Sequence, residues 1–138
     1  MNLMMLILYL GVGPFLLRLV VYVYNSLRED PASGIPEPSL GKAFGMMAAV
    51  TVADFLIRII LLAMFAGVEG NAPAMMGITM VVYFVLIFLS MVGIFALVLP
   101  TRLGPAVVIA IMILLSYVFI GFLIQQIVQS AATASYRV

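Results

Sequence analysis

The chain alternates between long apolar runs and short polar connections. A membrane-spanning helix needs about 20 consecutive, mostly apolar residues. Four runs of that length are present, and they cover residues 3–26, 44–66, 75–99 and 106–128. A transmembrane β-barrel has segments of about ten residues in which apolar and polar positions alternate, and these runs do not alternate. The pattern therefore predicts an all-α bundle of four transmembrane helices in a single domain.

The connections between the runs contain residues that end helices. The first connection holds three prolines, and the second holds two glycines and a proline. Proline cannot continue a helix because it lacks the backbone N–H. The third connection, residues 100–105, is so short that helices three and four are expected to form a tight antiparallel hairpin. Connections of this size leave no room for a folded domain outside the membrane.

The first run is expected to be a retained helix rather than a cleaved signal peptide. A signal sequence has a basic start and an apolar core of about 7–15 residues. This run is longer, and no charged side chain precedes it. Gly11, Gly13 and Pro14 are expected to bend the helix, since proline removes one helical hydrogen bond and clashes with the preceding turn.

Composition narrows the class of protein. Of the 138 residues, 67% are hydrophobic and 8% are charged, and the mean hydropathy is +1.35. Soluble domains have roughly 25% charged residues, so a soluble domain is excluded. The net charge of +1 offers no basic surface to nucleic acid. Because cysteine and histidine are absent, we expect no metal site and no cofactor. The high hydropathy predicts that the protein lies in the lipid bilayer.

The few basic residues predict an orientation. Arg28, Lys42 and Arg102 fall in the first and third connections, which share one side of a four-helix protein, whereas Arg137 and the N-terminal amine fall on the other side. Short loops rich in Lys and Arg stay in the cytoplasm. We therefore expect a bacterial inner-membrane protein with both termini outside the cytoplasm, and dual insertion remains an alternative. Five tyrosines are expected to contribute to an aromatic belt at the interfaces: Tyr9, Tyr22, Tyr24, Tyr83 and Tyr136.

Three charged residues fall inside the runs: Arg18, Asp54 and Arg58. Each costs roughly 2.5–3.5 kcal/mol at the centre of a bilayer, so we expect them to face protein. Asp54 and Arg58 are four residues apart and share a helical face, where they can form a charge-assisted hydrogen bond. A rise of about 1.5 Å per residue gives Arg18 a similar depth on the antiparallel neighbour. The pattern predicts a shared cluster, and an ion pair that joins helices is favoured over a transport site.

Two further patterns lie along the second and fourth helices. Small residues recur at every fourth position of the second helix: Gly41, Gly45, Ala49 and Ala53. Such a stripe lets another helix approach closely. A polar edge follows one face of the fourth helix: Tyr117, Gly121, Gln125 and Gln129. Unsatisfied polar groups cost several kcal/mol in hydrocarbon, so this edge is expected to bond to other helices, with a pore or headgroup lining as the alternative.

One short stretch resembles a known family. Gly11, Gly13 and Arg18, in the pattern Gly-x-Gly-x-x-x-x-Arg, resemble the start of the small dual-topology fluoride channels. That family also carries an Asn in its second span and a Thr-Thr-Phe element in its third. Here the second run has no Asn and the third has Thr79 as its one threonine, so we assign no family from the sequence.

No enzyme motif stands out along the chain. Without histidine there is no Ser–His–Asp arrangement, and no phosphate loop or dinucleotide fingerprint is present. The paired charges, the small-residue stripe and the glutamines are features that helices use to bind helices. We therefore expect a non-enzymatic accessory subunit that packs against other membrane subunits, or a homo-oligomer. The alternative is a small oligomeric channel or transporter with Arg18, Asp54 and Arg58 at its centre.

Overall fold

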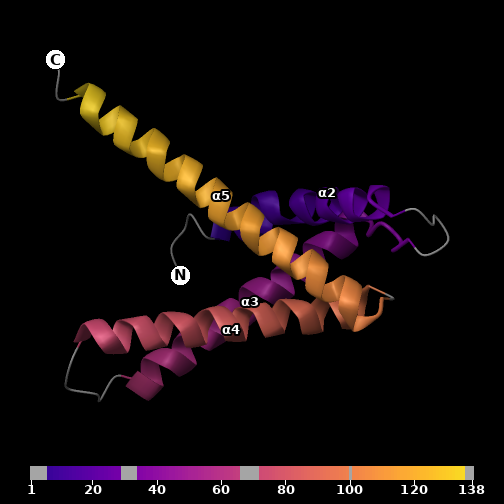
Figure 1. Cartoon of the computed structure of the whole chain (residues 1–138), viewed down its shortest axis with the longest axis horizontal. Coiled ribbons are helices and arrows are strands. Elements are labelled where there is room, and N and C mark those ends of the chain that lie inside the picture. Colours follow the sequence, from indigo (N-terminus) through magenta and orange to yellow (C-terminus); the bar gives the residue numbers. More distant parts are fainter. Residues whose placement is uncertain (1–5, 29–33, 66–71, 100, 136–138) are drawn as a thin grey trace.

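A computed structural model describes residues 6–28, 34–65, 72–99 and 101–135 (Figure 1). Tyr136 and Arg137 lie outside this part. The described chain is helical: a π-helical segment, η1 (Ile7–Val12), continues into α2 (Gly13–Ser26), and α3 (Leu40–Phe65), α4 (Ala72–Val98) and α5 (Leu103–Ser135) follow. Four helices, the first formed by η1 and α2, are long and apolar enough to cross a membrane. The predicted all-α integral membrane protein with four transmembrane helices is confirmed.

The helices pack mainly against their neighbours in the sequence. α3 lies between α2 and α4, α4 contacts α5, and a further contact between α2 and α5 closes the bundle. The chain reverses direction between Leu99 and Arg102, where the N–H of Thr101 donates to the carbonyl of Leu99 over 2.7 Å. The predicted hairpin of the third and fourth transmembrane helices is thereby confirmed. Toward its C-terminal end, α5 points away from α3 and α4 (Figure 1).

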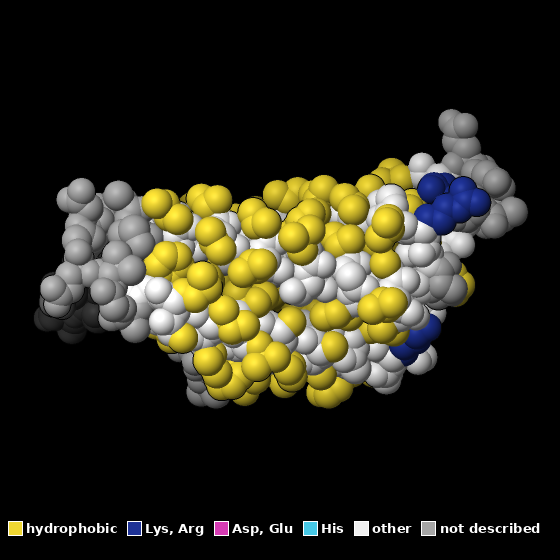
Figure 2. All heavy atoms as spheres, turned by 90° about the horizontal axis from the view of Figure 1, so that it is seen from below, with side chains coloured by type: hydrophobic (Ala, Val, Ile, Leu, Met, Phe, Trp, Pro, Cys, Tyr) yellow, Lys and Arg dark blue, Asp and Glu magenta, His cyan; other side chains and the backbone are white. Residues whose placement is uncertain are grey.

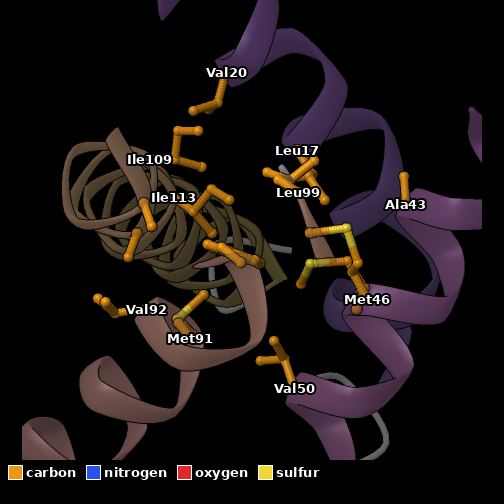
Figure 3. Packing of buried hydrophobic residues seen from close by; sticks show 14 of the residues in the cluster. Leu17, Val20, Ala43, Met46, Val50, Met91, Val92, Leu99, Ile109 and Ile113 are labelled. Carbon is orange, nitrogen blue, oxygen red and sulfur yellow. The ribbon is translucent and has the colours of Figure 1, made fainter. Parts of the chain in front are cut away.

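The core lies where the four helices cross. Each helix contributes apolar side chains spaced by three or four positions, which is the spacing of one helical face. The cluster in Figure 3 includes Leu17, Val20, Met46, Val50, Met91, Ile109 and Ile113, all of them buried. Because lipid tails are as apolar as these side chains, close packing rather than the hydrophobic effect favours helix association here.

The first transmembrane helix changes type at the predicted bend. η1 ends at Val12, and α2 begins at Gly13 with Pro14 in its first turn. The first four N–H groups of an α-helix have no partner within that helix. The missing N–H of Pro14 therefore leaves no α-helical hydrogen bond unmade, and the π-helical segment absorbs the change of register.

Side-chain hydrogen bonds fix the connection between α2 and α3. The Asn25 amide nitrogen donates to the carbonyl of Ile35 over 2.7 Å, and the Asn25 amide oxygen accepts from the N–H of Ile35 over 2.9 Å. The Ser39 hydroxyl accepts from the N–H of Lys42 over 3.3 Å, which satisfies one free donor at the start of α3. This cap explains why α3 begins at Leu40, four residues before the predicted span.

The outer surface of the molecule has the composition of a lipid-facing surface. Figure 2 shows hydrophobic side chains over most of one face, and the Lys and Arg side chains visible on that face lie at one end. That end carries the α2–α3 and α4–α5 connections (Figure 1). On this face, charge lies at the boundary of the apolar surface, where a bilayer tolerates it best.

At Gly13 the first transmembrane helix closely approaches side chains of α3 and α5. A Cβ at this position would lie 2.7 Å from the Tyr117 Oη, 2.9 Å from the Met47 Cε and 3.2 Å from the Met47 Cγ. Gly13→Ala is therefore expected to destabilise the protein by about 1–3 kcal/mol, the usual cost of overpacking. Thermal unfolding in detergent measures the change.

Gly45→Ala on α3 is the matched control, because nothing lies within 4 Å of a Cβ there. Alanine in an open helical position is expected to stabilise the protein by up to about 1 kcal/mol. Equal unfolding temperatures for the Gly13→Ala and Gly45→Ala variants would contradict the close approach.

Candidate functional site

Polar side chains from two helices meet at the buried carboxylate of Asp54 on α3. Asp54 has no exposed surface. One helical turn later, the Arg58 Nε donates to the Asp54 Oδ2 over 2.9 Å. From α4, the Tyr83 hydroxyl donates to the Asp54 Oδ1, and the Arg58 Nη2 donates to the Tyr83 hydroxyl oxygen over 2.7 Å. These three residues form a closed set, called here the Asp54 triangle.

Within the Asp54 triangle, the negative charge of Asp54 is balanced by the positive charge of Arg58. Both oxygens of the carboxylate accept hydrogen bonds, and the guanidinium carbon of Arg58 also lies 4.7 Å from the centre of the Tyr83 ring. A cation over an aromatic face gains additional electrostatic attraction when it is removed from water. Removing one partner of a buried ion pair typically costs about 3–5 kcal/mol, because the other charge stays buried. The arrangement links α3 to α4.

Two further tyrosines extend the polar residues across the bundle. Tyr9 of η1 lies beside Tyr83 and within electrostatic range of Asp54. Its ring meets the ring of Tyr117 on α5 edge to face, with centroids 5.1 Å apart. The Tyr117 hydroxyl is buried and has no hydrogen-bond partner among the described residues. Polar side chains from all four transmembrane helices are thus contiguous.

The structure does not bring Arg18 into this set. Arg18 is exposed on α2, and among the described residues no hydrogen bond or ion pair joins it to Asp54. The depth estimated from the sequence was wrong, because α3 begins at Leu40: Asp54 lies about 21 Å from the α2–α3 connection and Arg18 about 12 Å from it. The direction of Arg18 around the helix axis differs as well. The neighbouring Leu17 is fully buried, and a step of one residue turns the next side chain by about 100°. Arg18 therefore points outward.

The other residues singled out in the sequence are mostly uncovered. In the small-residue stripe, Gly41, Gly45 and Ala49 are exposed and Ala53 is half-buried. Among the described helices, none therefore packs closely along it. On the polar edge of α5, Tyr117 and Gly121 are half-buried, whereas Gln125 and Gln129 are exposed.

The sequence interpretation missed Tyr9 and Tyr83, which it assigned to an aromatic belt. Tyr9 is only 7% exposed, and Tyr83 bonds to both ions of the pair. The position of Tyr83 in the sequence could have shown that it is not a belt residue, because residues of an aromatic belt lie at the ends of a span. Tyr83 lies six residues inside the span Gly77–Val98, at a depth of about 9 Å.

A groove opens beside the Asp54 triangle, between α3 and α4. It encloses about 790 Å³, and Arg58 and Tyr83 are among its lining residues. Its remaining lining is apolar apart from Thr79: Phe55, Ile59, Leu61, Leu62, Phe65, Met80 and Phe84. The groove therefore presents one guanidinium and one phenol on an otherwise apolar surface.

Comparison with protein-family models, curated proteins and solved structures found no match to this chain. Among the described residues, no group of three or more metal-ligating side chains could hold a metal ion.

Tyr83→Phe tests the Asp54 triangle with a minimal change. The substitution removes one hydroxyl that bonds to both Asp54 and Arg58. It is expected to destabilise the protein by about 1–3 kcal/mol, because the buried Asp54 carboxylate and the half-buried Arg58 guanidinium each lose a partner. Thermal or denaturant unfolding of the purified protein measures the loss.

Tyr22→Phe is the matched control, since Tyr22 is 60% exposed and no hydrogen bond joins it to another described residue. Its expected change is within about 0.5 kcal/mol. Equal effects of the two substitutions would argue against the Asp54 triangle.

Proposed function

We propose that the chain is a non-enzymatic accessory subunit that packs against other chains of a larger membrane complex. Arg18 carries the proposal. It lies eight residues before the end of the span Ile7–Ser26, about 12 Å inside the apolar region. Its side chain is exposed, and a lipid-facing charge at such depth is strongly unfavourable. An acidic or polar side chain of another chain would remove that cost.

The surroundings of Arg18 have the composition of a binding surface. Phe15 and Tyr22 are 63% and 60% exposed, and their spacing of three and four residues gives them the same face of α2 as Arg18. Leu19, which is 57% exposed, lies next to this face. Arginine and aromatic residues are over-represented among the residues that dominate protein–protein binding energy. The expected partner is a transmembrane helix with an acidic side chain opposite Arg18 and apolar residues around it.

Two other uncovered features support an assembly. The small-residue stripe of α3 suits close approach by another helix, because small side chains let two backbones come together. The end of α5 carries Phe119 and Phe122, which are 62% and 55% exposed, together with exposed glutamines. Amide side chains near the end of a span can bond across to another helix.

The alternative is a small oligomeric channel or transporter. It is favoured by the contiguous polar side chains, which come from all four transmembrane helices and include the ion pair of Asp54 and Arg58. Against it, both oxygens of Asp54 already accept hydrogen bonds from within the chain. The first proposal is therefore preferred.

Arg18→Leu is expected to release the chain from its partners. Gentle detergent extraction of the wild-type complex, followed by native mass measurement, should give co-migrating polypeptides that the Arg18→Leu variant loses. The isolated variant should unfold at the same temperature as wild type or higher, because Arg18 bonds to no other described residue. Arg102→Leu, which removes an exposed arginine at the α4–α5 turn, is the control and should keep the partners.

A wild-type preparation that contains only copies of this chain would contradict the accessory subunit if it also passes ions in liposomes. In that case a folded Asp54→Asn variant without flux would assign transport to the carboxylate.

The distribution of basic residues supports one orientation of this subunit in a bacterial inner membrane. Arg28, Lys42 and Arg102 belong to the connections at one end of the bundle, and such connections favour the cytoplasm. A reporter fused after Val138 should therefore report the non-cytoplasmic side. A cytoplasmic signal would contradict this orientation, and a mixed signal would indicate dual insertion.

A further inference from the structure

The groove between α3 and α4 has the size and shape of a ligand site. Its volume of about 790 Å³ falls within the roughly 300–1,000 Å³ of typical small-molecule pockets. Four aromatic rings contribute to its walls: Phe55, Phe65, Tyr83 and Phe84. Leu62 is 72% exposed at its edge, so the groove is accessible from the lipid side.

Arg58 turns unused hydrogen-bond donors toward this groove. A guanidinium has five N–H donors. Its Nε donates to Asp54 and one Nη2 hydrogen to Tyr83, and the other three N–H groups have no acceptor among the described residues. The Arg58 side chain is 37% exposed and lines the groove. In hydrocarbon each unsatisfied donor costs several kcal/mol, so an occupant with acceptor oxygens would be stabilised here.

The charge balance selects the kind of acceptor. Asp54 and Arg58 already form a neutral pair, with the Tyr83 hydroxyl bonded to both. An anionic occupant would bring a second negative charge into the apolar region, and the desolvation penalty is several kcal/mol per ion even after relaxation. A neutral carbonyl oxygen accepts the free N–H groups without adding charge. The ion pair therefore favours a ketone-like or quinone-like oxygen over a carboxylate or a phosphate.

The depth of the site in the membrane also favours a neutral occupant over an anionic one. Asp54 lies eleven residues before the end of α3 at Phe65, which places it about 16 Å from that end. Arg58, which presents the donors, lies seven residues before the same end, about 10 Å away, so the polar part of the groove lies roughly a third of the way across a hydrocarbon core about 30 Å thick. Phospholipid headgroups do not reach this depth, whereas a lipid whose head is an uncharged ring is soluble there.

We propose that this groove binds a neutral lipid of the quinone class. Its carbonyl oxygen accepts hydrogen bonds from the Arg58 guanidinium, its flat ring stacks on the aromatic walls, and its apolar tail lies along the open side of the groove. The site is separate from the α2 face that carries Arg18. It therefore does not depend on the proposed subunit role.

Binding of decyl-ubiquinone to the purified protein in detergent tests the proposal. A ligand that binds only the folded state raises the unfolding temperature in a saturable way, and circular dichroism measures this. Leu62→Trp introduces a larger side chain at the edge of the groove and is expected to weaken binding about tenfold or more. Leu123→Trp is the matched control, because Leu123 is 44% exposed on α5 and does not line the groove.

Two further probes separate carbonyl recognition from other causes of stabilisation. Decylbenzene has a ring and a tail but no carbonyl, and decanoate has a tail and a negative charge. The proposal expects a saturable rise with decyl-ubiquinone in wild type and Leu123→Trp, and little or none with the other two compounds. Equal stabilisation by decylbenzene, stronger stabilisation by decanoate, an unaffected Leu62→Trp variant or no rise at all would each overturn it.

The Arg18→Leu variant separates a failure of the groove proposal from a failure of the proposed subunit function. It should leave the response to decyl-ubiquinone unchanged, whether or not the variant still binds partner chains. A lost response in this variant would overturn the separation of the two sites.

Discussion

The fold depends on how one carboxylate is accommodated near the middle of an apolar bundle. Asp54 has no exposed surface, and a buried charge is tolerated only when it is paired and hydrogen-bonded. Arg58 supplies the opposite charge from the same helix, and Tyr83 supplies the second hydrogen bond from the next one. Apolar helices in lipid can slide past one another at little cost. A bond to a single carboxylate oxygen fixes the register of α3 against α4.

The other helices adapt to this link through tyrosine rings and one glycine. Tyr9 lies beside Tyr83 and meets Tyr117 edge to face, which connects α3 and α4 to η1 and α5. Gly13 leaves the space that the Tyr117 hydroxyl and the side chain of Met47 occupy. What remains uncovered, the arginine on α2 and the groove beside Arg58, lies outside this packed set. Those two features carry the functional proposals.

The sequence was sufficient for everything that depends on length and local spacing. Apolar runs of spanning length gave four transmembrane helices, a short connection gave the hairpin, and the four-residue spacing of Asp54 and Arg58 gave their hydrogen bond. The direction in which each side chain points within the folded bundle could not be predicted from length and spacing. Arg18 points outward and lies closer to the α2–α3 connection than Asp54 does, and Tyr83 bonds to Asp54 from a helix whose rotation no local pattern specifies. The start of α3 also differs from the prediction, because Ser39 caps the helix before its apolar run begins.

A double-mutant cycle between Asp54→Asn and Tyr83→Phe tests the central claim most directly. The two residues belong to different helices and are 29 positions apart in the sequence, so any coupling between them reports the tertiary link itself. Unfolding free energies are measured for wild type, both single variants and the double variant in the same detergent. The account predicts a coupling energy of about 0.5–3 kcal/mol, because the second substitution removes a bond that the first has already weakened. Strict additivity of the two single effects would contradict it.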